Sequence, residues 1–103
     1  MNKEKGVLLL NEQSHSFSFE VKDAKERTLY KMVFVKATNR KMKKALINKL
    51  INVCKGNGIM AVSVIFYAYN KVFVRKIVNM LENEGIDILE FKGKSPIDEE
   101  VEM

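Results

Sequence analysis

Residues 50–69 read LINVCKGNGIMAVSVIFYAY and contain the change of pattern on which the fold depends. The first part closes a segment in which apolar residues recur every three or four positions, which is typical of an amphipathic helix. Gly56-Asn57-Gly58 follows, and residues that tolerate a positive φ commonly end a helix. Residues 59–69 are then apolar on both faces, as in a strand inside a sheet. The stretch predicts a helix that leads directly into a buried strand.

The same arrangement occurs a second time. Helical spacing over residues 71–84 predicts a second helix with Asn70 as its N-cap, and Gly85 ends it before a strand at 86–91. The first helix is expected over residues 39–55. Because a crossover between two strands of one sheet is nearly always right-handed and joins parallel strands, both helices should pack on a common sheet.

The N-terminal third has the two-residue period of β-strands. Residues 16–22 alternate apolar and polar side chains, and residues 28–37 are rich in β-branched and aromatic residues, so the pair predicts an antiparallel hairpin. The short apolar run 7–10 predicts an edge strand. Strands 28–37, 59–69 and 86–91 are expected to be parallel. The fold prediction is an α+β or α/β domain with a single mixed sheet in the order β-β-β-α-β-α-β, an N-terminal hairpin followed by a βαβαβ unit.

The length of 103 residues fits one compact domain, predicted over residues 1–94, followed by a flexible acidic tail at 95–103. The N-terminus has too few consecutive apolar residues for a signal peptide, and the run 59–69 is about half of the roughly 20 residues that a membrane helix needs. Cys54 is the single cysteine and is expected to be a buried, inert thiol. These features predict a cytoplasmic protein with no membrane contact.

The charge is distributed unevenly along the chain. Residues 22–55 contain eleven Lys or Arg and two acids, a net charge of +9, whereas residues 82–103 contain eight acids and two lysines, a net charge of −6. A basic face combined with an acidic tail is often found in proteins that contact nucleic acid. The alternative is a solvated, salt-tolerant surface without a binding role.

The densest positive charge lies at the start of the first predicted helix. Cations are disfavoured there by about 0.3–1 kcal/mol each, because the amide end of a helix is already partly positive, so their presence suggests that an anion binds. Both helices should begin at the carboxyl edge of the sheet, where open parallel sheets commonly bind ligands. The predicted nucleic-acid-binding residues are Asn39, Arg40, Lys41, Lys43, Lys44, Asn70, Lys71 and Arg75.

Two further features refine this prediction. The chain has no P-loop and no GxGxxG, and lysine predominates among the cations, which favours sequence-tolerant contact with phosphates over an enclosed nucleotide or base reading. Tyr30, Tyr67 and Tyr69 are candidates for stacking on bases if the helices leave their sheet face uncovered. The alternative is that these rings belong to the core.

Catalytic signals are weak. His15 is the single histidine and has no neighbouring group for nucleophilic or metal chemistry. Glu20-Val-Lys22 and Glu90-Phe-Lys92 match the Glu-x-Lys of some metal-dependent nucleases, but Asp87 and Glu90 should point to opposite faces of their strand. We therefore expect no enzymatic activity, no metal and no cofactor.

Two functions remain open from the sequence. The first is a small, non-enzymatic DNA- or RNA-binding protein. The second is a small regulator or inhibitor that binds another protein, with the Lys-, Asn- and Ile-rich composition suggesting an AT-rich viral or mobile-element genome. A homodimer is a further hypothesis, because an edge strand at residues 7–10 would be available to pair with a second copy.

Overall fold

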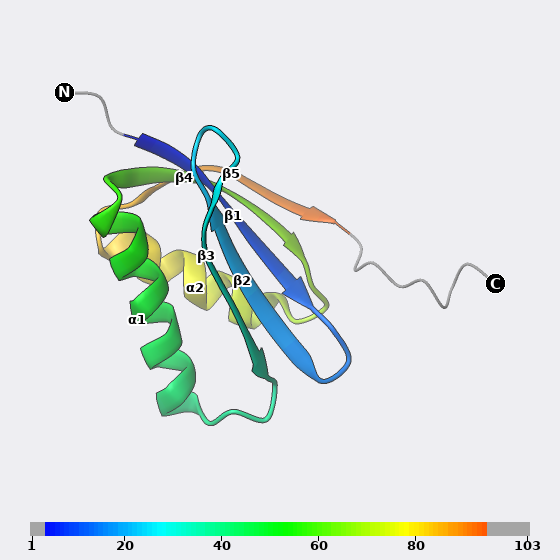
Figure 1. Ribbon diagram of the computed structural model, residues 1–103. Helices are drawn as coiled ribbons and strands as arrows, with labels where there is room; N and C mark the ends of the chain where they lie inside the picture. Colours follow the sequence, from blue (N-terminus) through cyan, green and yellow to red (C-terminus); the bar gives the residue numbers. More distant parts are fainter. Residues whose placement is uncertain (1–3, 95–103) are drawn as a thin grey trace.

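The computed structural model describes residues 4–94 and contains five strands and two helices in the predicted order β-β-β-α-β-α-β. Their bounds are β1 Glu4–Glu12, β2 Ser16–Lys22, β3 Thr28–Val35, α1 Arg40–Gly56, β4 Ile59–Tyr67, α2 Lys71–Asn83 and β5 Asp87–Lys94. All strands belong to one mixed sheet, and both helices lie on the same side of it (Figure 1). The predicted tail, residues 95–103, lies outside the described residues.

The strand order corrects one prediction. The sheet runs β3-β2-β1-β4-β5, so β1 is the central strand, antiparallel to β2 and parallel to β4. The prediction of an edge strand at residues 7–10 is wrong, and pairing of two copies through that strand is wrong with it. The apolar run is only the middle of a nine-residue strand. Because the residues at its two ends are mostly polar, the sequence pattern indicated a shorter strand. A local sequence pattern also does not show which strands will be neighbours in a sheet.

The strand β3 lies at the edge of the sheet. It runs in the same direction as β4 and β5, as predicted, but β2 and β1 separate it from β4. The helix α1 therefore crosses over these two strands on its way from one half of the sheet to the other, and it contacts β2, β3 and β4. This long crossover places α1 beside α2 (Figure 1).

The core fills the space between the helices and one face of the sheet. Four phenylalanine rings meet there, with centroid separations of 5.0 Å between Phe17 and Phe73 and 5.3 Å between Phe19 and Phe34. Fully buried aliphatic residues complete the core, among them Leu8, Leu10, Ile47, Leu50, Val62, Val64, Ile77 and Leu81. Burial of this amount of apolar surface is the main source of stability of such a small domain.

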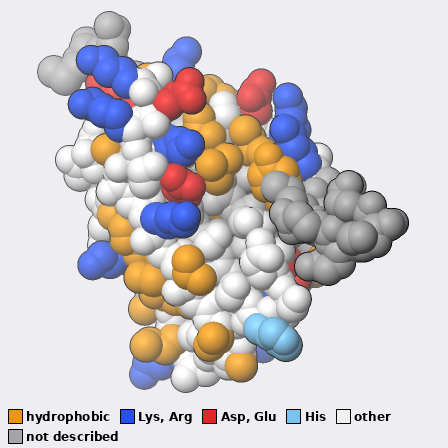
Figure 2. Space-filling view, turned by 45° about the vertical axis from the view of Figure 1, so that its right-hand side comes forward, with side chains coloured by type: hydrophobic (Ala, Val, Ile, Leu, Met, Phe, Trp, Pro, Cys, Tyr) orange, Lys and Arg blue, Asp and Glu red, His pale blue; other side chains and the backbone are white. Residues whose placement is uncertain are grey.

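The other face of the sheet is not covered by a helix. Figure 2 views this face obliquely and shows basic, acidic and hydrophobic side chains interspersed on it. Cross-strand neighbours on this face include Glu20 opposite Lys31. Charges of both signs therefore lie side by side on this face.

Both helix ends form as the sequence predicts. The Asn39 side chain accepts a hydrogen bond from the backbone N–H of Met42 at 2.8 Å, and Asn70 caps α2. Gly58 and Gly85, just after the two helices, have φ values of 72° and 82°, which side-chain-bearing residues rarely adopt. Within residues 4–94, neither helix has the length and apolar composition needed to cross a bilayer.

Cys54 lies in the core, with a side chain that is fully buried by α1 and the sheet. Burial raises the pKa of its thiol to about 11. We expect the native protein not to react with a thiol reagent at about pH 8, where an ordinary thiol of pKa about 8.5 reacts readily. Absorbance measurements with a chromogenic disulfide, with and without denaturant, test this, and rapid labelling of the native protein would contradict it.

Candidate functional site

The two helices start at the same edge of the sheet, because each follows the carboxyl end of a strand that runs in the same direction. Their first turns are in contact. The Lys43 ammonium of α1 lies 5.5 Å from the centroid of the Phe73 ring of α2, a distance typical of a cation–π interaction. This contact partly covers one of the cations at the start of α1.

The edge between the helix starts already contains an acid of the protein. Glu12, at the end of β1, is 8% exposed. Its carboxylate accepts hydrogen bonds from the backbone N–H groups of Tyr69 and Asn70, both at 2.8 Å, and from the Lys36 ammonium at 2.6 Å. The turn before α2 is therefore held by an internal anion, the Glu12 carboxylate.

The ionisation of Glu12 follows from these contacts. Burial favours the neutral acid and acts to raise the pKa of the carboxyl. The hydrogen bonds from Lys36, Asn70 and Tyr69 lower the pKa, and their combined effect is larger than that of burial. The pKa of Glu12 therefore lies below its ordinary value of 4.5. Glu12 is thus a carboxylate at neutral pH.

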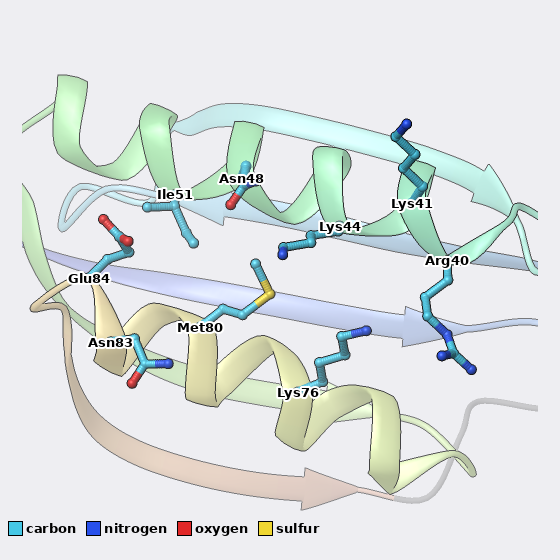
Figure 3. Close-up of a pocket in the computed structure, with 9 residues that line it drawn as sticks. All are labelled: Arg40, Lys41, Lys44, Asn48, Ile51, Lys76, Met80, Asn83 and Glu84. Carbon is cyan, nitrogen blue, oxygen red and sulfur yellow. The ribbon is translucent and has the colours of Figure 1, made fainter.

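Three of the six predicted cations lie instead in a surface groove between α1 and α2, which we call the interhelical groove. It has a volume of about 730 Å³. Figure 3 shows Lys44 and Lys76 extending from opposite helices into the gap, which the Met80 side chain also enters. The groove is lined by Arg40, Lys41, Lys44, Asn48, Ile51, Lys76, Met80, Asn83 and Glu84.

The charges along the groove have one sign over most of its length. Four of its lining residues are cations, and Glu84 is the one acid among them. Glu84 lies at the end away from Arg40 (Figure 3) and pairs with Lys55 at 2.6 Å. Its charge is thereby compensated within the protein, so the groove carries excess positive charge near the helix starts.

The structure divides the predicted cations among three places, of which the contact of Lys43 with Phe73 is one and the interhelical groove is another. Lys71 and Arg75 do not reach the interhelical groove. They lie on the opposite side of α2, where they line a second hollow of about 690 Å³, which we call the edge hollow. Its lining residues are Phe66, Ala68, Tyr69, Lys71, Arg75, Phe91, Gly93 and Lys94. The convergence of all predicted cations on a single site is therefore wrong.

Two lysines of these sites were missed by the sequence analysis. Lys76 lies in the interhelical groove and Lys94 in the edge hollow. The spacing of five residues between Lys71 and Lys76 places them on different sides of a helix with 3.6 residues per turn. That signal was present in the sequence, but which side faces α1 depends on how the helices pack.

The three tyrosines also differ in their surroundings. Tyr30 lies on the sheet face that the helices cover, and its hydroxyl is buried, which raises the pKa of the phenol. It is a core residue and not a stacking platform. Tyr67 is half-buried at the end of β4, and the Lys94 ammonium lies 5.8 Å from its ring centroid. Tyr69 follows the strand and is 68% exposed.

In comparisons with protein-family models and with curated protein sequences, nothing matches this chain. Within the described part, residues 4–94, no group of three or more His, Cys, Asp or Glu side chains is arranged to hold a metal ion. The interhelical groove and the edge hollow are therefore the two candidate binding sites.

Proposed function

We propose that this protein is a small nucleic-acid-binding protein that contacts the phosphate backbone through the interhelical groove. The observation that carries the proposal is the arrangement of Arg40, Lys41, Lys44 and Lys76 along one groove whose single acid is already paired. A row of like charges repels itself unless a partner neutralises it. A chain of phosphates supplies negative charge at regular intervals along such a row.

The composition of the groove favours binding without base specificity. Three of its four cations are lysines, which neutralise phosphates as point charges, and only Arg40 has the bidentate geometry that reads base edges. The groove lining contains no histidine or cysteine and a single carboxylate. The role that we propose is accordingly binding and not catalysis.

Salt dependence tests this proposal. With about four phosphates neutralised, the association constant for a DNA duplex should fall by roughly 100-fold between about 50 and 200 mM salt. Fluorescence anisotropy with a labelled duplex at several salt concentrations measures the slope. Absence of binding at the lowest salt concentration, or binding that does not change with salt, would refute the proposal.

A pull-down experiment distinguishes nucleic-acid binding from the alternative function, in which the protein is a regulator that binds another protein. Nuclease-treated lysate is passed over the immobilised protein. A single stoichiometric protein partner that is retained by the native protein, in the absence of duplex binding, would replace nucleic acid as the ligand of the groove. Loss of all retained material after nuclease treatment supports nucleic acid.

A further inference from the structure

The edge hollow lies where β4 ends, α2 begins and β5 forms the free edge of the sheet. Lys71, Arg75 and Lys94 line it, and none of the lining residues within 4–94 is an acid. Two aromatic rings are exposed there: Tyr69 by 68% and Phe91 by 40%. The interhelical groove has cations but no aromatic lining residue, so the two sites differ in chemistry.

The Phe91 ring is fixed in position by packing against Phe66. It packs against Phe66 with a centroid separation of 4.7 Å and an interplanar angle of 34°. Phe66 in turn covers Gly93, where an added Cβ would lie 2.6 Å from the ring. The absence of a side chain at Gly93 thus lets Phe66 support Phe91, whose exposed part is a rigid apolar surface at the edge of the hollow.

The ring of Tyr69 is presented by an anchored turn. The backbone N–H of Tyr69 donates to the buried Glu12 carboxylate, as does that of the next residue, Asn70. The backbone at residues 69–70 is therefore fixed by hydrogen bonds, while the Tyr69 ring is largely exposed to solvent. An exposed aromatic ring on an ordered backbone loses little conformational freedom when a planar ligand stacks on it.

The cations are placed close to these rings. The Arg75 guanidinium lies 5.9 Å from the Phe91 ring centroid, and Lys94 lies at the end of β5 beside Tyr67. Lys71 follows Tyr69 by two residues, in the first turn of α2. Flat apolar rings beside several cations match a ligand that combines a planar base with a phosphate.

We propose that the edge hollow binds unpaired nucleotides of a single strand, whose bases stack on Tyr69 and contact the exposed part of Phe91, and whose phosphates contact Lys71, Arg75 and Lys94. This inference rests on the proposed function and adds a preference to it. Bases in a duplex already stack on one another and their faces are not available, so a duplex can use the cations but not the rings.

The test compares a single-stranded oligo-dT or oligo-U with a duplex of the same length at the same salt concentration. The replacement Tyr69→Leu removes the ring, and since this side chain is mostly exposed, the fold should be retained. We expect single-strand binding to weaken by roughly 5- to 100-fold, while duplex binding changes by less than about twofold. Phe91→Leu is a second variant, and Tyr69→Phe, which keeps a ring, is the matched control.

A spectroscopic readout is available because the chain contains no tryptophan. The replacement Tyr69→Trp introduces one fluorophore at the proposed contact. Stacking of a base should quench its emission on addition of the single strand and not on addition of the duplex. Equal quenching by both, or single-strand affinity unchanged in Tyr69→Leu and Phe91→Leu, would overturn the inference. If duplex binding persists in that case, the proposed function remains in place. If the native protein binds neither the single strand nor the duplex, both the proposed function and this inference are refuted.

Discussion

Replacement of Arg40, Lys44 and Lys76 together by glutamate is expected to weaken duplex binding by at least about 100-fold at low salt. Each replacement removes one attractive charge and adds a repulsive one. The three side chains come from two different helices, and all three line the interhelical groove. The loss should therefore be much larger than for charges scattered over the surface.

A matched control separates the groove from the overall charge. Lys5, Lys25 and Lys49 are exposed and do not line the interhelical groove. Their replacement by glutamate changes the net charge by the same amount. Anisotropy titrations should show a small decrease for this variant, from the long-range potential alone. Equal losses in the two triple variants would mean that binding depends on net charge and that the groove has no special role.

The second large effect is expected at Glu12. The replacement Glu12→Ala leaves two backbone N–H groups and the Lys36 ammonium without the carboxylate that they contact. Loss of the acceptor from these partly buried hydrogen bonds should lower the free energy of unfolding by about 2–3 kcal/mol, which corresponds to a decrease in Tm of about 10–20 °C for a domain of this size. Thermal unfolding followed by circular dichroism measures the change.

The control for this variant is Glu90→Ala, which removes an acid from an exposed position on β5. Its effect on the free energy of unfolding should be within about 0.5 kcal/mol. A decrease in Tm for Glu12→Ala as small as that of the control would show that the turn before α2 does not depend on the carboxylate. That result would also weaken the account of Tyr69 as a ring on an anchored turn.

The same contacts give Glu12 a defined pH dependence. Since the pKa of Glu12 in the folded protein lies below its ordinary value of 4.5, its contribution to stability is complete above that pH and is lost as the pH falls through the folded pKa. The replacement Glu12→Gln removes this titration. The difference in stability between the native protein and this variant should therefore narrow on acidification below about pH 4.5.

A second acid, Asp23, also loses its contribution to stability at low pH, and it is present both in the native protein and in Glu12→Gln. The hydrogen bond from the Arg27 backbone N–H is the main reason why the pKa of Asp23 is lowered from its ordinary value of 3.8. Its contribution to stability also decreases at low pH, but by the same amount in the native protein and in Glu12→Gln. A constant difference between the two proteins across this range would contradict the role of Glu12.

The candidate site was only partly visible in the sequence. The clustering of cations in residues 40–44 is a local feature, and Arg40, Lys41 and Lys44 do line one groove. Lys43 instead lies over Phe73, which helical spacing alone does not show. The role of Glu12 depends on the turn at residues 69–70, more than fifty positions away in the chain. Contacts of that separation leave no periodic signal.

The sequence alone determined the elements of this protein and their order. The two-residue and 3.6-residue periods, the Asn caps and the glycines at positive φ are all local, since each depends on a residue and its near neighbours. Only the tertiary structure decided that β1 is central, that α1 crosses two strands to reach α2, and that the cations divide between a groove and a hollow. Strand pairing and helix packing are settled by the burial of side chains that are distant in the chain, and the pattern of one segment does not contain that information.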